Sequence, residues 1–485
     1  MALLSPTIIA VAAALVLLAR VVLRLTSPLA RLPGPTVSKV TSLWLKYKEL
    51  RAERTAYIHS LHKRYGPVVR VAPDEVSFTS WPAVKEIYCS GGSGYDKTEF
   101  YDLFKIFGIR TMFTTLNKAD HATRKRILAD RYANSNVMKS VSAEGIQERS
   151  RRFVERCTAV PGTAADVYVT LHAYACDCIT HHLFHPHGTD ALRNQVDEDM
   201  MHQVASDNSL QNRLISYYSP TLHSLFGGVL ALFAKPRMTP LANNYVLKTA
   251  KCPDPAPFTL MSRLEEKSKE LTMTDMAAEC LDHMTAGIDT TGDGLCFLMW
   301  ELSQPRSLEI QRRLSEEVRE GIARGTPIDQ LPFLDAVVCE GLRCFPSIPM
   351  SLPRYVPADG RLIDETFIPE HTKVSCQALS VHMVNTDVFP RPEVFNPDRW
   401  LVQGGDAERR RLMFAFSNGG RGCVGKHLAM LEMKTLLRDV YAQCRTVPHV
   451  SMKAEDMVMA DDLVSTRPAG GRCLLHFERL DSYSS

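Results

Sequence analysis

The sequence predicts a mainly α-helical protein with a small β portion, in the α+β class. Helical periodicity dominates the chain from about residue 120 to 345, whereas strand-like stretches are short and lie near 68–78, 351–376 and 472–477. The 485 residues are 45% hydrophobic, which is enough to bury a large core and excludes a disordered chain. Length alone allows about two to four domains.

The first element is an apolar run over residues 8–23, interrupted by one arginine and closed by Arg24. Its length is near the lower limit for crossing a bilayer. Its positive charges follow it, whereas a cleavable signal peptide carries them in front. We therefore predict a signal anchor at 1–27, helical over about 7–25, with the remaining chain in the cytosol. A core helix is the alternative, which the prolines of the stiff elbow at 28–35 disfavour.

The charge distribution bears on partners. The chain has 57 Lys and Arg against 54 Asp and Glu, a formal charge of +3. The segment before Glu49 has six basic residues and no acidic one, so the rest is mildly acidic. This argues against a nucleic-acid surface. The thirteen cysteines contain no C-x-x-C pair, which favours buried thiols in a reducing compartment over a disulfide framework or zinc ribbon.

The remaining elements follow in order. Residues 44–65 read as a helix, and Val68–Phe78 reads as a hairpin around an Ala-Pro-Asp-Glu turn. Helices are expected at 124–132, 143–158, 164–184, 196–216, 262–303, 308–323 and 332–344. Because no linker follows residue 35, we predict one large domain over 36–485.

A glycine-rich loop at 416–425 carries the strongest motif, and a helix is expected to start near Val424. One interpretation is a phosphate-binding loop ending at Lys426, but His427 replaces the required hydroxyl residue and the alternating strand and helix pattern is missing. The other is a Cys423 thiolate at a helix N-terminus. A thiolate among glycines suits an axial ligand of haem iron, because the flat macrocycle can lie against the backbone.

The loop matches the pattern F-x-x-G-x-R-x-C-x-G at Phe416, Gly419, Arg421, Cys423 and Gly425. It resembles the haem-binding loop of the cytochrome P450 family. The resemblance implies a bound haem b with Cys423 as the axial iron ligand. It also places Gly425 at the cofactor, Arg421 against a propionate and Phe416 against the ring.

A second match is Glu340-x-x-Arg343 followed by Arg399. Alone, this spacing is typical of a surface ion pair on one helix face. In the family that the chain resembles, the three side chains hold a helix to the loop before the cysteine. A carboxylate between two guanidinium groups can make the bidentate bonds this requires.

The third match, Ala-Gly-Ile-Asp-Thr-Thr at 286–291, lies in a long expected helix and resembles the family's A-G-x-D-T-T segment. The glycine and threonines should bend the helix locally. The resemblance implies Ala286 beside the cofactor, Thr290 as donor to the iron-bound peroxo group and Asp289 as proton relay. A threonine pair bonding only to its own turn is the alternative.

Two further basic positions resemble propionate partners: Lys125, four residues after His121, and Arg354. The family has Arg where this chain has Lys125, so the individual propionate ligand stays open. A solvated basic face is the default interpretation of both.

A histidine cluster at positions 181, 182, 185 and 187 has one helical i,i+4 pair. The glutamate of a metalloprotease helix is missing. We interpret the cluster as surface histidines.

The resemblance implies a membrane-anchored, fungal-type monooxygenase of secondary metabolism at the endoplasmic reticulum. The sequence shows no flavin or dinucleotide motif, so electrons are expected from a separate NADPH-cytochrome P450 reductase. Lys426 and Arg409–Arg411 are candidates for its docking face, and a solvated charge run is the alternative. A haem-dependent isomerase or dehydratase and a haem-binding protein without turnover remain alternative functions.

The resemblance assigns substrate contact to the segments 95–116, 280–291, 347–353 and 461–465. Their apolar side chains suggest a hydrophobic small molecule, and core packing explains each residue equally well. These side chains are Phe104, Phe107, Met112, Met284, Ile348, Met350, Leu352, Leu463 and Val464.

Overall fold

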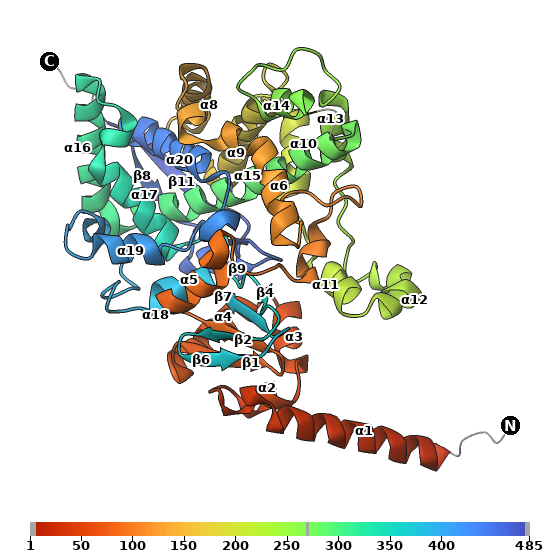
Figure 1. Cartoon of the computed structure of the whole chain (residues 1–485). Coiled ribbons are helices and arrows are strands. Elements are labelled where there is room, and N and C mark those ends of the chain that lie inside the picture. Colours follow the sequence, from red (N-terminus) through yellow and green to blue (C-terminus); the bar gives the residue numbers. More distant parts are fainter. Residues whose placement is uncertain (1–5, 268–270, 481–485) are drawn as a thin grey trace.

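The computed structural model describes residues 6–267 and 271–480 and confirms the mainly helical α+β class. Figure 1 shows most helices in one part of the molecule and the largest sheet beside the short helices that follow the N-terminal helix. The helices are α1 Pro6–Thr26, α2 Thr36–Val40, α3 Leu43–Leu50, α4 Arg54–Tyr65, α5 Trp81–Cys89, α6 Lys118–Leu128, α7 Asn134–Val137, α8 Ser140–Thr158, α9 Val167–Phe184, α10 Gln195–Ala205, α11 Leu210–Tyr218, α12 Pro220–Leu230, α13 Pro240–Thr249, α14 Leu260–Glu266, α15 Met273–Ser303, α16 Leu308–Arg324, α17 Pro332–Cys344, α18 Ala378–Val384, α19 Asp406–Leu412 and α20 Lys426–Tyr441.

The N-terminal helix α1 projects away from the rest of the chain (Figure 1). Its segment Thr7–Thr26 is long and apolar enough to cross a membrane, with a mean hydropathy of 2.5 and no burial against the protein. The elbow that follows packs onto the sheet: the Arg70 N–H donates to the carbonyl of Pro33 at 2.8 Å. Gly34 has a φ of +152°, and a Cβ there would lie 2.4 Å from the Arg70 carbonyl oxygen, so only glycine fits.

Within the described residues, the β portion consists of four small sheets. The predicted hairpin is confirmed: β1 and β2 pair antiparallel, and β7 and β4 extend them to the order β1-β2-β7-β4. A three-stranded sheet has the order β3-β11-β8, and β5-β6 and β9-β10 form two-stranded sheets. The strands are β1 Val68–Ala72, β2 Glu75–Phe78, β3 Ala165–Asp166, β4 Arg354–Tyr355, β5 Arg361–Ile363, β6 Thr366–Ile368, β7 Lys373–Cys376, β8 Cys444–Pro448, β9 Met459–Asp461, β10 Thr466–Pro468 and β11 Leu474–Arg479.

The long helix α15 is the centre of the main hydrophobic core. It starts with a capping box, in which Thr272 and Asp275 satisfy each other's backbone N–H groups. It packs most extensively along α9, and α8 and α20 complete this layer. Helix α15 is continuous from Met273 to Ser303, so it carries Asp289 and Thr290 in mid-helix between the core and the pocket described below.

Three expected helices are interrupted. The helix at 44–65 divides at Ala52, which has a φ of +55°. The helix at 196–216 divides into α10 and α11 at a Ser-Asp-Asn-Ser segment, where the Asp207 carboxylate accepts the Ser209 N–H at 2.9 Å. Such residues bond their own backbone and end helices. The helix at 262–303 is α14 and α15, with 268–270 outside the described residues.

The interpretation of the histidine cluster as surface residues is wrong. His181 and His182 on α9 are buried, because a helix packed on several sides hides residues of every face. His182 stacks on Tyr132 with ring centroids 4.6 Å apart. His181 fills the space left by Gly145, where a Cβ would lie 2.1 Å from its ring nitrogen. Burial lowers the pKa of both to about 3, so both are neutral.

Candidate active site

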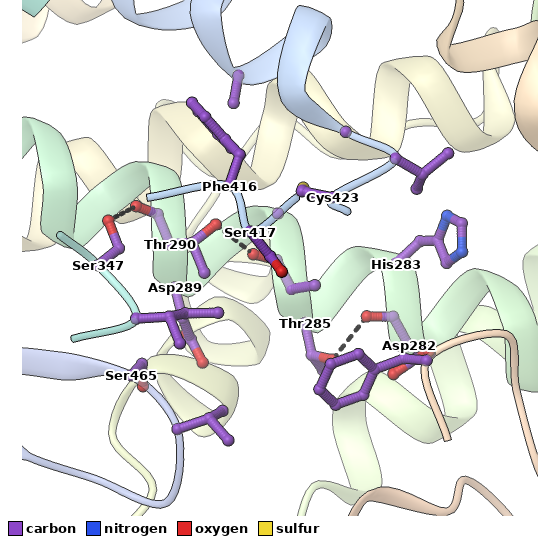
Figure 2. Close-up of a pocket in the computed structure, with 18 of the residues that line it drawn as sticks. Asp282, His283, Thr285, Asp289, Thr290, Ser347, Phe416, Ser417, Cys423 and Ser465 are labelled. Carbon is purple, nitrogen blue, oxygen red and sulfur yellow. Dashed lines mark hydrogen bonds between the residues drawn. The ribbon is translucent and has the colours of Figure 1, made fainter. Parts of the chain in front are cut away.

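The loop before α20 holds Cys423 at the wall of a large pocket. The Cys423 N–H donates to the Phe416 carbonyl at 2.9 Å, which folds the loop back on itself. Gly419 has a φ of +72°, and a Cβ there would lie 2.0 Å from the Tyr88 carbonyl, so the loop needs glycine at this point. Helix α20 starts at Lys426, two residues after the predicted start. Of the thirteen cysteines, all within the described residues, Cys423 alone is exposed, and it lines the pocket (Figure 2).

Opposing effects act on the Cys423 thiol. Loss of hydration raises its pKa above the ordinary value. The backbone N–H groups of Gly425 and Lys426 and the charges of Lys125 and Lys426 oppose this rise. The groups around the sulfur thus favour its anion, as expected at a helix N-terminus, but they offset only part of the rise caused by loss of hydration.

A buried ionic network supports this loop. Arg343 donates two bonds to Glu340, at 2.8 and 2.9 Å, and both side chains are fully buried. Arg399 Nε donates to the same carboxylate at 3.0 Å, and the Trp400 indole N–H at 2.9 Å. His382 connects the network to the loop, since its ring bonds the Arg343 carbonyl at 3.0 Å and accepts the Phe414 N–H at 2.8 Å. The expected link between α17 and the cysteine loop is therefore present.

Four basic side chains line the pocket near the cysteine loop: Lys97, His121, Arg354 and Arg421. All four are buried, yet none forms an ion pair with a carboxylate among residues 6–267 and 271–480. Their donors go to neutral oxygens: Lys97 to the Phe113 carbonyl, Arg354 to the Tyr101 hydroxyl at 2.8 Å, and Arg421 to the Leu116 carbonyl at 2.9 Å. In the described part of the chain, the Nε atoms of Arg354 and Arg421 have no hydrogen-bond partner.

Burial and mutual repulsion of these bases shift their pKa values. Loss of hydration, followed by the charge of Arg354, lowers the pKa of Arg421 to about 10. The same two causes lower the pKa of Lys97 well below its ordinary value, with Arg421 adding to the effect. The pKa of His121 falls to about 3, so this ring is neutral. A ligand with negative groups at this end would relieve the repulsion.

On α15, Thr290 and Asp289 both line the pocket. The Thr290 hydroxyl donates to the Ala286 carbonyl at 2.8 Å, and the Thr290 carbonyl accepts the Ser347 hydroxyl at 2.7 Å (Figure 2). Asp289 points toward Ser465, away from Cys423, and its Oδ1 has no hydrogen-bond partner in the described residues. Burial, opposed mainly by Arg237, raises the pKa of Asp289 to about 7.

The predicted cofactor residues fall into two groups. Phe416, Gly425 and Ala286 line the pocket together with Cys423, Arg421 and Arg354. Lys125 is not among the lining side chains: its ammonium donates to the Gly420 carbonyl at 2.9 Å, behind the loop. Its contact with a propionate stays a prediction. Lys97 was missed, because a single lysine in a Tyr-Asp-Lys-Thr stretch carries no motif.

The pocket has a cavity of about 310 Å³ between α15, the cysteine loop and the C-terminal turn at 462–465. Six of the nine predicted apolar substrate contacts line it: Phe104, Met112, Ile348, Leu352, Leu463 and Val464. The other three lie elsewhere. Met284 is buried in the core, Phe107 is exposed, and Met350 lines a second cavity.

The wall away from the cysteine is polar, which the sequence did not indicate. Arg213, Arg237, Asp207, Asp289 and Asp462 all line this end, which we call the distal end. The expectation of a largely apolar pocket therefore holds for the middle of the cavity and is wrong for its distal end.

These residues fit a planar iron cofactor with acidic side groups. A thiol at a helix N-terminus offers an iron ligand. Glycines let a flat ring approach the backbone. The cluster of bases without carboxylate partners supplies a counter-charge for two propionates. The fold and this donor set define the class of a haem protein with a cysteine ligand.

The comparisons with known proteins agree with this class. Residues 32–470 match the family model described as cytochrome P450, and the chain belongs to this family. It is 29% identical to cytochrome P450 monooxygenase stcB of Emericella nidulans, over 93% of this chain and 88% of that protein. It is 27% identical to cytochrome P450 monooxygenase orf2 of Aspergillus niger, over 93% of each chain. It is also 27% identical to cytochrome P450 monooxygenase aflV of Aspergillus parasiticus, over 93% of this chain and 91% of that protein. The predicted similarity to fungal members is confirmed, and the protein is an oxidoreductase of the cytochrome P450 monooxygenase class.

Proposed function

We propose that this protein is a haem-thiolate monooxygenase that inserts one oxygen atom of O2 into a small molecule of fungal secondary metabolism. The observation that carries the proposal is that the thiol of Cys423 and Thr290 of α15 line the same cavity. The names of its fungal relatives support the reaction class. An isomerase or dehydratase on the same cofactor would turn over without a reductase, so a reductase-free assay separates the two.

Haem b bound here supplies the activation of O2 and the oxidation of the substrate. Cys423 serves as the iron ligand, and Arg354, Arg421 and Lys97 hold the propionates. The Thr290 hydroxyl donates its hydrogen bond to the Ala286 carbonyl. Its oxygen lone pairs therefore remain able to accept a hydrogen bond from a water or a reacting group in the cavity. Asp289, with a pKa near neutrality, can take up a proton and release it at the distal end.

We propose an NADPH-cytochrome P450 reductase as the electron donor. The surface behind the cysteine loop offers exposed cations at Lys426 and Arg411. The other two predicted docking residues, Arg409 and Arg410, already form bonds within the protein. Arg409 is buried and donates to the Val402 carbonyl, and Arg410 forms an ion pair with Asp406 at 2.9 Å. Lys426 and Arg411 are therefore the first residues to test by charge reversal.

The ligand assignment is tested by the absorption spectrum of the reduced carbon monoxide complex. Thiolate ligation gives a red-shifted Soret band, which we expect for the wild type and for the control variant Cys252→Ala. Cys252 is a partly exposed cysteine in another region of the chain. Cys423→Ala should abolish the band together with NADPH-dependent turnover. Persistence of the band in Cys423→Ala would overturn the assignment.

We further propose attachment to the endoplasmic reticulum membrane through α1. A second apolar surface supports membrane contact: α12 has no buried residue, and Figure 1 shows it projecting from the edge of the helical part. Leu225, Phe226 and Val229 on α12 are 72, 55 and 59% exposed, and Leu232 and Phe233 follow at 79 and 85%. An apolar patch of this extent on a surface helix indicates contact with lipid or protein.

Membrane attachment is tested by removing the two surfaces in turn. Deletion of residues 1–30 should leave part of the protein in the membrane fraction, and adding Leu225→Asp and Phe226→Asp should release it. Val450→Asp is the control, since Val450 is 91% exposed outside α12. Full release by the deletion alone would show that α12 contributes nothing.

A further inference from the structure

The distal end of the pocket brings two arginines to one carboxylate oxygen. Arg213 lies on α11 and Arg237 in the segment between α12 and α13, so two different parts of the chain supply the two guanidinium groups. Arg213 Nη1 lies 3.4 Å from Asp207 Oδ2, and Arg237 Nε lies 3.5 Å from the same atom. Both distances exceed the roughly 2.7–2.9 Å of a strong charge-assisted bond. The carboxylate holds neither guanidinium tightly.

The rest of each side chain indicates which contacts are fixed. Arg213 Nη2 donates to the Leu103 carbonyl at 2.6 Å, and its guanidinium lies 4.9 Å from the Phe104 ring centroid. Asp207 is held from behind, because its Oδ1 accepts the Ser209 N–H at 2.9 Å. For Arg237, the described residues show no hydrogen bond and no ion pair other than this long one, although its charge acts on Asp289 and Arg213. Arg237 therefore has free donors at the cavity wall.

The environment makes a second anion favourable at this point. Loss of hydration and the charge of Arg237 lower the pKa of Arg213 to about 10, so the two cations repel each other in spite of Asp207. The other carboxyls of this end form no ion pair with either arginine in the described residues, and they compete weakly for the two guanidinium groups. Leu463 N–H donates to Asp462 at 2.7 Å, and burial raises the pKa of Asp462 and Asp289, which favours their neutral forms.

We propose that Arg213 and Arg237 form a recognition site for a carboxylate at one end of the substrate. Two guanidinium groups that converge on one point match the two oxygens of a carboxylate. The apolar side chains of Phe104, Ile348 and Leu463 line the same cavity and contact the body of such a molecule. The substrate class is thus an apolar carboxylic acid whose acidic end lies at the distal end of the pocket.

This assignment rests on the proposed function only in calling the ligand a substrate, and it is tested by binding. Matched pairs of apolar carboxylic acids and their methyl esters, with linear and fused-aromatic scaffolds, are titrated into the holoenzyme by calorimetry. At least one acid should bind, about tenfold or more tightly than its ester. Equal affinity of acids and esters, or binding by no acid of the panel, would overturn the proposal.

Three variants locate the effect. Arg237→Gln should remove the preference for acids. It should leave the fold intact, because the only ion pair of Arg237 in the described residues is the 3.5 Å contact with Asp207. Asp207→Asn should strengthen acid binding severalfold, since it removes the competing charge and keeps the Oδ1 acceptor for Ser209. Arg324→Gln, in an exposed pair with Glu320, is the control. A preference retained in Arg237→Gln contradicts the site, whereas the carbon monoxide spectrum reports on Cys423 independently.

Discussion

The two ends of the pocket use buried charge differently. At the cysteine end, Lys97, Arg354 and Arg421 have no carboxylate partner in the described part of the chain. At the distal end, Arg213 and Arg237 share Asp207. Desolvated cations are costly unless they are paired. An end whose cations form no ion pair suits a ligand that is always bound, whereas an end with a weakly held anion suits a ligand that comes and goes.

The largest effect is expected where the cysteine end depends on a protein carboxylate. In the wild type, Arg343, Arg399 and Trp400 donate hydrogen bonds to the Glu340 carboxylate. Glu340→Gln replaces one of the accepting oxygens with an amide N–H₂ group that faces these donors. Breaking a buried ionic network of this kind costs about 3–5 kcal/mol. We expect a sharp loss of folded holoprotein and a lower thermal midpoint. Glu320→Gln, in an exposed pair with Arg324, is the control and should change neither. A normal yield of Glu340→Gln would show that the loop does not depend on this network.

The next effect separates the two ends directly. Lys97→Met removes one of the unpaired cations, so release of haem from the holoprotein to an acceptor protein should become about tenfold faster. Arg213→Met leaves Asp207 with Arg237 as its only ion-pair partner in the described residues, so the thermal midpoint should fall. Haem release should not change in this variant. An equal change of haem release in both variants would show that the two ends of the pocket do not differ in their role for haem.

The difference between the ends also explains what the sequence could predict. Phe416, Arg421 and Cys423 are contiguous, so the loop was recognisable without a structure. Residues whose role arises only when distant segments meet carry no pattern. Arg213 looks like a solvated charge of the helix expected at 196–216, Arg237 lies between expected helices in a stretch without a motif, and Lys97 is a single base. The start of α20 was placed within two residues, whereas the break between α10 and α11 depends on local bonds of Asp207.

A smaller effect is expected between the two ends, at Thr290. Thr290→Ala removes the hydroxyl that bonds the Ala286 carbonyl in the cavity. Coupling, the amount of product formed per NADPH consumed, should fall by about tenfold, with hydrogen peroxide released instead. Thr290→Ser keeps the hydroxyl and should retain coupling. Unchanged coupling in Thr290→Ala would assign proton delivery to another group.

The last effect is spread over several pH units and concerns two buried carboxyls that line the pocket. Burial raises the pKa of Glu432, which accepts the Thr291 hydroxyl at 3.3 Å, from 4.5 to about 8, and that of Asp289 from 3.8 to about 7. The folded state therefore holds extra protons, and the free energy of unfolding falls as pH rises through these windows, by up to about 1.4 kcal/mol per pH unit for each group. Glu432→Gln should flatten the dependence of the thermal midpoint up to pH 8. Asp289→Asn should flatten it only below about pH 7. Glu316→Gln, an exposed control, should leave the wild-type slope. Identical profiles for Glu432→Gln and the wild type would show that Glu432 is ionised throughout, and would remove the contrast between the two carboxyls.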